Sequence, residues 1–367
     1  MDGLLDDVGG MSVEVLCGQL LVGGFKGTTL TPSFTTALRE GRRGGAILFK
    51  RNLTGDLADV LGLNASILAA APAGLPPLIG VDQEGGRVAR FGAPLLVLPP
   101  MATVGRIGDV ELAERLAERQ GAELAALGFS MNFAPVLDVH TRADNPIIGD
   151  RSFSRDPERV AELGVAWARG LERGGVLACG KHFPGHGDTT TDSHLELPHV
   201  DHTRKRLDAV ELPPFVAAAR AKIAALMTAH VVFPALDPAR PATLSPAVSR
   251  DLRTLIGFDG ILVSDDLEMK AIKAPVEEAA VDAISAGCDM LLVCSDEDLQ
   301  DRAHRALVAR ANGNREFRMR CREAAMRCVG ARRRVPPRPV ASVDLLAAVL
   351  AASAPIAHEL RQRGGGS

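Results

Sequence analysis

The sequence lacks the signatures of several common classes of protein. Its six cysteines never fall in a CxxC pair, and several lie inside apolar runs, where cysteine behaves as a small hydrophobic residue. This usage argues against a disulfide framework and is typical of a reducing compartment. Positive charge is not in excess either, because the formal net charge is −3. A dedicated nucleic-acid binder would usually be clearly basic.

Membrane and cofactor signals are also missing. No apolar run approaches the roughly 18–20 residues that a membrane span needs, and the first residues, MDGLLDDVGG, are acidic where a signal peptide is basic. The motifs GxxxxGK[ST] and HExxH are absent, and Gly85-Gly86 is too short for a dinucleotide fingerprint. We therefore expect a cytoplasmic protein that binds neither membrane nor nucleic acid and uses no cofactor and no metal.

What the sequence does contain is a series of apolar runs, each followed by helical spacing. Most of the runs are continuous rather than alternating, as expected for strands buried on both faces of a parallel sheet. Eight strand–helix units favour a single (β/α)8 TIM barrel over an open doubly wound sheet. We predict strands over residues 19–24, 45–49, 77–82, 129–138, 175–182, 225–233, 260–265 and 287–294.

Two of the intervening helices can be bounded. Over residues 157–173, four apolar side chains fall on one stripe: Val160, Leu163, Trp167 and Leu171. Asp156 is placed to cap the start of this helix, and Gly174 to end it. Residues 110–127 repeat the pattern and stop at Gly128.

The barrel is predicted to form a catalytic domain over residues 1–310. Residues 311–367 are predicted to form a C-terminal helical extension packed on the barrel, with a disordered tail at its end. The arginine-rich segment 302–338 is interpreted as a solvated helical surface with a proline-rich link, rather than as an anion-binding patch.

Polar residues gather directly after the predicted strands, above all in KHFPGHGDTTTDSHLEL at 181–197. Function in a TIM barrel lies at these strand ends, so they predict the site. Asp265 ends the run ILVSDD, and one of its two adjacent acids must point into the barrel mouth. We interpret Asp265 as a carboxylate nucleophile or base; a helix cap or loop salt bridge is the alternative. Glycoside hydrolysis needs such a group and a second partner across the bond.

The second partner is predicted in the central stretch. Asp192 lies two residues from His194, and a neighbouring carboxylate favours the protonated imidazole that can donate a proton to a leaving group. A loop-stabilising pair is the alternative. Lys181 and His182 would face the substrate or instead pair with Asp265 or Asp82.

Two further interpretations stay open on the pattern alone. Arg90 and Arg151 are either substrate clamps or barrel-rim ion pairs, and the rim is favoured for isolated arginines. Five residues of the central stretch also resemble metal-ligand material: His182, His186, His194, Asp188 and Asp192. A metal-dependent hydrolase is therefore kept as an alternative.

The motifs as a set resemble those of the glycoside hydrolase family 3 β-N-acetylglucosaminidases. The central KHFPGHGDTTTDSHLELP is accompanied, in order, by IGVDQEGGRVARF, NFAPVLDV, NPIIGDRSF, MTAHVVFPALD and GFDGILVSDDLEMKAI. The resemblance runs from about residue 18 to 295. Its combination of KHFPGHGDxxxDSH with SDDLxM is highly specific.

The resemblance implies a retaining hydrolase that removes terminal N-acetylglucosamine. By the matching motif positions, Asp265 would be the nucleophile and His194 the general acid/base, with Asp192 as its partner. The sugar would be bound by five residues: Asp82, Arg90, Arg151, Lys181 and His182. Gly185 and Gly187 would let the loop close for chemistry and open for release.

The chain resembles the compact cytoplasmic enzymes of this family that trim anhydromuropeptides during cell-wall recycling. We therefore expect a monomer acting on a glycan or muropeptide that carries N-acetylglucosamine, although the arginine-rich segment leaves assembly open. The alternatives are a phosphorylase of the same family, whose histidine acid/base would repel phosphate less than a carboxylate, and a catalytically silent sugar-binding protein.

Overall fold

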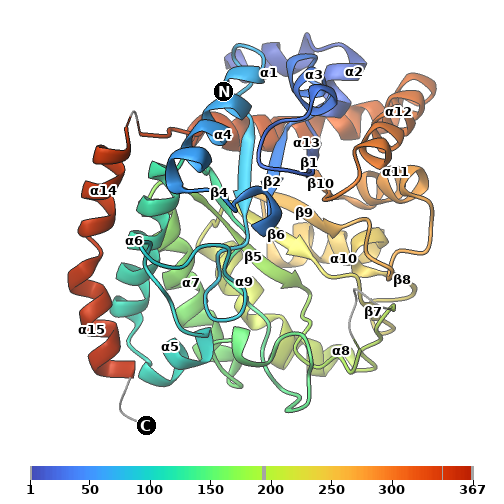
Figure 1. Cartoon of the computed structure of the whole chain (residues 1–367). Coiled ribbons are helices and arrows are strands. Elements are labelled where there is room, and N and C mark those ends of the chain that lie inside the picture. The colour runs from blue at the N-terminus through green and yellow to red at the C-terminus, as the bar shows by residue number, and fades with distance from the viewer. Residues whose placement is uncertain (1, 192–195, 341, 365–367) are drawn as a thin grey trace.

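The computed structural model describes residues 2–191, 196–340 and 342–364. Its centre is a closed barrel of parallel strands in the order β1-β10-β9-β6-β5-β4-β3-β2, surrounded by helices (Figure 1). The TIM barrel expected from the sequence is confirmed. The barrel strands are β1 Leu21–Gly23, β2 Gly45–Leu48, β3 Leu78–Val81, β4 Met131–Asn132, β5 Leu177–Phe183, β6 Ala225–Thr228, β9 Ile261–Asp266 and β10 Met290–Val293.

Each predicted strand overlaps a barrel strand, with β5 and β9 running one residue further than predicted, but two predictions were too long. Strand β4 keeps only two residues of the predicted ten, because Pro135 has no N–H to continue the ladder and only Val136 still bridges Lys181. The predicted range 225–233 divides into β6 and a separate strand β7 (Val232–Phe233). Strand β7 pairs antiparallel with β8 (Asp237–Pro241), outside the barrel.

Helices cover the outside of the barrel. The helix predicted over 157–173 is confirmed as α7 Pro157–Arg173, with Asp156 accepting the N–H of Glu158 at its start. Its four stripe residues are all buried, which explains why the apolar spacing predicted this helix correctly. The other helices are α1 Asp2–Gly9, α2 Val13–Gly18, α3 Pro32–Arg39, α4 Leu57–Ala70, α5 Met101–Ile107, α6 Val110–Ala126, α8 Arg204–Arg206, α9 Pro213–Arg220, α10 Pro246–Arg250, α11 Val276–Ala286, α12 Glu297–Gly313, α13 Arg315–Arg334, α14 Val343–Ala351 and α15 Ala354–Gly364. Short 3-10 and π turns are η1 Lys50–Asn52, η2 Gly149–Arg151, η3 Leu207–Glu211, η4 Ala242–Leu244 and η5 Asp251–Ile256.

Helix α13 closes the amino-terminal end of the barrel. Its Cys328 and Ala331 are buried with the barrel interior. Arg332 is 1% exposed, and its guanidinium donates to the carbonyl of Gly44, just before β2, and to Oε1 of Gln19, just before β1, at 2.8 Å. The amino-terminal edges of two barrel strands are therefore held by a residue from the far end of the chain.

The interpretation of the arginine-rich segment as a solvated surface was wrong in part. Arg320 and Arg327 of α13 join Arg253 around the carboxylate of Asp289, which is fully buried at the start of β10. Asp289 also accepts the N–H of Leu262 at 2.9 Å. A buried carboxylate needs such partners, so these arginines fasten the helix to the sheet.

The last two helices lie along the outside of the barrel beside α5 and α6 (Figure 1). Contrary to the expectation that no segment is apolar enough for a span, an 18-residue window within Val343–Gly364 reaches a mean hydropathy of 1.5. By length and composition alone this segment resembles a membrane helix. It is, however, interrupted at residues 352–353 and is bonded to the barrel helices: Arg119 donates to the carbonyl of Val349 at 2.7 Å, and Arg363 pairs with Asp109 at 2.6 Å. The predicted disordered tail falls on residues 365–367, outside the described residues.

Candidate active site

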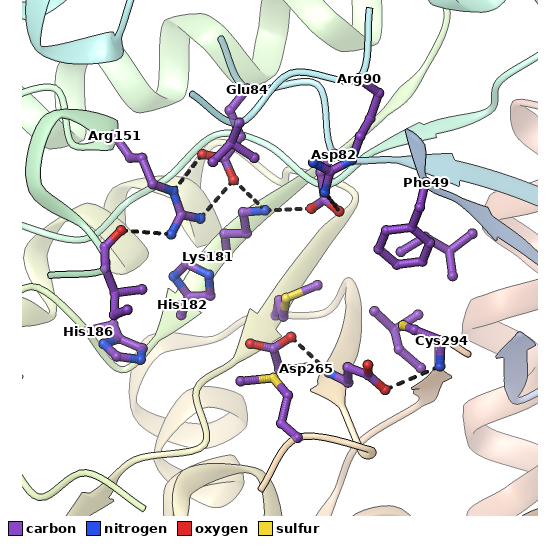
Figure 2. Close-up of a pocket in the computed structure, with 17 residues that line it drawn as sticks. Phe49, Asp82, Glu84, Arg90, Arg151, Lys181, His182, His186, Asp265 and Cys294 are labelled. Carbon is purple, nitrogen blue, oxygen red and sulfur yellow. Dashed lines mark hydrogen bonds and ion pairs between the residues drawn. The ribbon is translucent and has the colours of Figure 1, made fainter. Parts of the chain in front are cut away.

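A cavity of about 250 Å³ opens at the carboxyl ends of the barrel strands (Figure 2). The predicted site residues that the structure describes all line it: Asp82, Arg90, Arg151, Lys181, His182 and Asp265. They come from β3, β5, β9 and the loops after β3 and β4, so the fold assembles them from distant parts of the chain. The position at strand ends, used to select them, is the position that the barrel gives to a site.

A chain of ion pairs runs along one side of this cavity. Lys181 Nζ lies 2.9 Å from Asp82 Oδ1 and 2.7 Å from Glu84 Oε1. Arg90 donates to the other oxygen of Asp82 at 3.0 Å, and Arg151 donates to both oxygens of Glu84 at 2.8 Å. Figure 2 shows these five side chains in a row, with Asp265 facing them across the cavity. Arg90, Arg151 and Lys181 thus form ion pairs, as the alternative interpretation from the sequence required, and they also line the cavity.

Glu84 is the centre of this network and is 2% exposed. Burial opposes its ionisation, but Arg151 and Lys181 hold the pKa of Glu84 well below its usual range. Burial alone would lower the pKa of Arg151 and of Lys181. The Glu84 carboxylate nevertheless raises the pKa of Arg151, and Asp82 and Glu84 raise that of Lys181. All three groups are therefore charged at neutral pH, and the two cations are fixed in place before any ligand arrives.

His182 is oriented by a second buried carboxylate. Its Nδ1 lies 2.7 Å from Asp138 Oδ2, and Asp138 also accepts the backbone N–H groups of His182 and His186. Despite its burial, Asp138 keeps a pKa below the usual range, chiefly because of His182, so it acts only as an acceptor. The proton of a neutral His182 therefore lies on Nδ1. His182 pairs with neither Asp265 nor Asp82, the partners considered from the sequence.

Asp265 is the carboxylate that enters the cavity. Burial raises the pKa of this group, but the nearby His230 and His182, the N–H of Asp266 and Lys181 outweigh it and keep Asp265 ionised. Asp266 turns to the loop beyond, where its Oδ1 accepts the N–H of Glu268 at 3.1 Å and that of Cys294 at 3.2 Å. Burial raises the pKa of Asp266 to about 7. Asp265 is therefore the more acidic of the two neighbours, and Asp266 keeps its proton to higher pH than an ordinary aspartate.

Some residues that line the cavity were not selected from the sequence. Glu84 follows Asp82 by two positions, a spacing that places both on one side of an extended chain, and this was the available signal. His186 also lines the cavity, and burial lowers its pKa to about 4, so it is a neutral group here. Phe49 adds an aromatic face beside Arg90. Apolar and sulfur side chains complete the lining: Ile47, Met227, Met269, Leu292 and Cys294.

The predicted acid/base pair cannot be placed in this arrangement. Asp192 and His194 lie outside the described residues, which resume at Glu196. Of the residues that the metal interpretation named, three are described: His182 contacts Asp138 at 2.7 Å, His186 contacts Thr189 at 2.7 Å, and Asp188 contacts Arg142 and His202.

Packing requires glycine at positions 185 and 187 of the loop, for a reason that the sequence did not reveal. A Cβ on Gly187 would lie 1.8 Å from the carbonyl oxygen of Val139, so only glycine lets the two backbones approach this closely. Gly185 has φ +142°, and a side chain there would meet Glu211. Both glycines therefore fix the course of the loop out of β5.

Comparison with known proteins agrees with this geometry. Residues 13–326 match the family described as the glycosyl hydrolase family 3 N terminal domain. A β-hexosaminidase of Neisseria meningitidis serogroup C is 41% identical over 301 residues, which cover 79% of this chain and 82% of the relative.

Solved structures give the same result. A glycoside hydrolase family 3 β-N-acetylglucosaminidase from Paenibacillus sp. FPU-7 superposes with a TM-score of 0.85 at 39% identity, covering 95% of this chain and 69% of that one. NagZ from Neisseria gonorrhoeae superposes with a TM-score of 0.78 at 34% identity, covering 94% and 97%. NagZ has also been solved in complex with N-trifluoroacetyl-D-glucosamine.

Proposed function

The chain belongs to glycosyl hydrolase family 3, and we propose that it is a retaining exo-β-N-acetylglucosaminidase that works through a covalent intermediate on Asp265. The observation that carries the proposal is the half-buried, ionised carboxylate of Asp265 facing a row of fixed charges across a small cavity. The β-hexosaminidase and β-N-acetylglucosaminidase relatives support the substrate class.

In the proposed first step, Asp265 attacks the anomeric carbon from the face opposite the leaving group. His194, with Asp192 beside it, protonates the departing glycosidic oxygen. In the second step His194 takes a proton from water, which releases the sugar from Asp265 and regenerates the carboxylate. Two inversions at one carbon give net retention of configuration.

The rest of the cavity is suited to hold a single sugar. Asp82 is an acceptor for sugar hydroxyls, held in place by Lys181 and Arg90 on its two oxygens. His182, held through Nδ1 by Asp138, lines the same cavity. A cavity of about 250 Å³ lies below the range of roughly 300–1,000 Å³ usual for drug-sized ligands, in keeping with removal of one terminal residue at a time.

The first experiment is hydrolysis of a chromogenic β-N-acetylglucosaminide in phosphate-free buffer. We expect Asp265→Ala to lose at least about 10³-fold in kcat, because no other group can form the intermediate. We expect His194→Ala to lose roughly 10²–10⁴-fold on substrates with poor leaving groups and less on good ones. Asp259→Asn, a change at an exposed aspartate, serves as the matched control.

Product analysis separates the mechanisms. NMR of the first-formed sugar should show the β-anomer; the α-anomer would rule out the double displacement. Turnover that appears only with phosphate and yields a sugar 1-phosphate would replace hydrolysis by phosphorolysis. Loss of activity in a chelator would point to a metal-dependent enzyme, and binding without turnover to a sugar-binding protein.

We further propose that the natural substrate is an N-acetylglucosaminyl anhydromuropeptide, handled in the cytoplasm during cell-wall recycling. The six cysteines are all free and buried, which supports a reducing compartment. Comparing kcat/KM for the muropeptide with that for chitobiose tests the proposal. An equal or higher value for chitobiose would contradict it.

A further inference from the structure

Outside the sugar cavity, three side chains with metal-binding atoms converge beside the loop that leaves β5. They are Asp188 in that loop, His202 just before α8, and Glu211 at the end of η3. One nitrogen or oxygen from each lies within 4.8 Å of the other two. None of the three lines the cavity that holds Asp265.

Two arginines hold the outer oxygens of this cluster. Arg142 Nε lies 3.3 Å from Asp188 Oδ1, which leaves Oδ2 to contact His202 Nε2. Arg206 lies 3.3 Å from Glu211 Oε1. Each carboxylate is therefore fixed by an arginine through one oxygen; the other oxygen of Asp188 contacts His202, and that of Glu211 faces no described hydrogen-bond partner.

Glu211 provides an independent sign that a ligand belongs here. Its side chain is 4% exposed, and its Oε2 has no hydrogen-bond partner. Leaving such an oxygen buried and unpaired costs roughly 1–3 kcal/mol or more. Burial also raises the pKa of Glu211. A cation bound between Glu211 and the Asp188–His202 pair would satisfy this oxygen.

We propose that Asp188, His202 and Glu211 bind a divalent transition-metal ion such as Zn²⁺. One imidazole and two carboxylates are suitable ligands for such an ion, with water in the remaining position. Bonds of about 2.0–2.2 Å in a tetrahedron separate the ligand atoms by roughly 3.4 Å. Oδ2 of Asp188 and Nε2 of His202 are already in contact and would move apart to this spacing, while Glu211 would approach them by at most about 1.4 Å, which are side-chain adjustments. The two arginines offset the charge of the carboxylates, which favours reversible binding.

The position of the ion gives it a means of control over the active site. Asp188 and His202 are 14 residues apart and flank Asp192 and His194 in the chain. An ion bound to both Asp188 and His202 would cross-link two positions on either side of the predicted acid/base pair. The proposal that the ion controls activity rests on the proposed function, because it assumes that His194 is the acid/base. The proposal that the three residues bind an ion does not.

Binding is tested by titrating the full-length protein, stripped with chelator, with ZnCl₂ in a calorimeter and by melting it with and without ZnCl₂. Wild type should bind one equivalent that His202→Ala and Glu211→Gln lose, and the ion should raise the Tm of wild type alone. His199→Ala, at an exposed histidine three positions from His202, should keep the ion. His194→Ala should also keep it, which separates this site from an ion held by the predicted acid/base.

The proposal is overturned if wild type binds no ion, or if His202→Ala and Glu211→Gln bind as wild type does. Because Glu211 is buried, His202→Ala at a partly exposed position decides the matter should Glu211→Gln fail to fold. For control of activity, Zn²⁺ should change kcat of wild type and leave His202→Ala unchanged; an equal change in both would refute that half. Ion binding by a protein that hydrolyses no glucosaminide would instead refute the proposed function and leave the metal site standing.

Discussion

Replacing Glu84 by glutamine tests whether the buried ionic network holds the site together. The change keeps the size of the side chain but removes the charge that Arg151 contacts through both carboxylate oxygens and that Lys181 contacts at 2.7 Å. Breaking a buried ion pair by removing one partner costs about 3–5 kcal/mol. With an unfolding entropy of about 2.1 cal/mol/K per residue, a chain of 367 residues should lose about 4–6 °C in Tm.

The pH dependence of this loss has a definite sign. Arg151 and Lys181 hold the pKa of Glu84 well below its usual range, although burial opposes them. The stabilisation is therefore complete above the unfolded pKa of about 4.3 and is lost as pH falls towards the lower folded value. The difference in Tm between wild type and Glu84→Gln should stay constant from pH 5 to 8 and narrow below about pH 4.

Calorimetry with a matched surface pair supplies the control. Glu118 lies 2.7 Å from Arg173, but the two side chains are 42% and 53% exposed. Exposed pairs contribute about 0.2–1 kcal/mol, so Glu118→Gln should shift Tm by about 1 °C or less. Similar shifts for the two variants would refute the reasoning, as would a Glu84→Gln enzyme with wild-type kcat/KM.

Three other changes follow from the structure. Burial raises the pKa of Asp266 to about 7, so the protonated carboxyl stabilises the folded state, and this contribution is lost as pH rises from about 4 to 7. The Tm of Asp266→Asn relative to wild type should therefore increase between pH 5 and pH 8. A Tm difference that stays constant over this range would contradict the prediction. Arg332→Met leaves the buried Oε1 of Gln19 without its donor, while the Gly44 carbonyl keeps the N–H of Leu78, and should lower stability to urea by about 1–3 kcal/mol, against little change for exposed Arg334→Met. Gly187→Ala forces the loop away from Val139 and should lower kcat/KM about 10- to 100-fold, whereas a wild-type value would show that the loop tolerates the shift.

Much of the barrel could be predicted because its signals are local. Strands buried on both faces are continuous apolar runs, and the stripe on α7 repeats every turn of a helix. The site could be located for a related reason, since a parallel barrel brings all carboxyl strand ends to one mouth. Asp265 and Lys181 were selected by this argument, whereas Asp82 was assigned to the sugar by the family resemblance.

Pairings between distant residues could not be predicted. Glu84 meets Arg151 across 67 residues of sequence, and Arg332 meets Gln19 across 313. The sequence pattern does not distinguish a solvent-exposed arginine from one that is buried at the end of the barrel. The distinction depends on which residues, distant in the sequence, the fold places next to its guanidinium. Likewise, Asp265 differs from Asp266 because the fold brings His230, His182 and Lys181 near Asp265, whereas Asp266 is buried beside Glu268.

The closure of the barrel by α13 has a consequence for biosynthesis. Gly44 and Gln19 receive the guanidinium of Arg332 only after 288 and 313 further residues have been made. At about 5–20 residues per second, the ribosome takes roughly 15–60 s to supply it. Until then β1 also lacks its neighbour β10, and its unpaired edge stays open to other chains. The nascent chain is therefore a substrate for chaperones that bind during translation, and its folding is completed only after α13 leaves the exit tunnel.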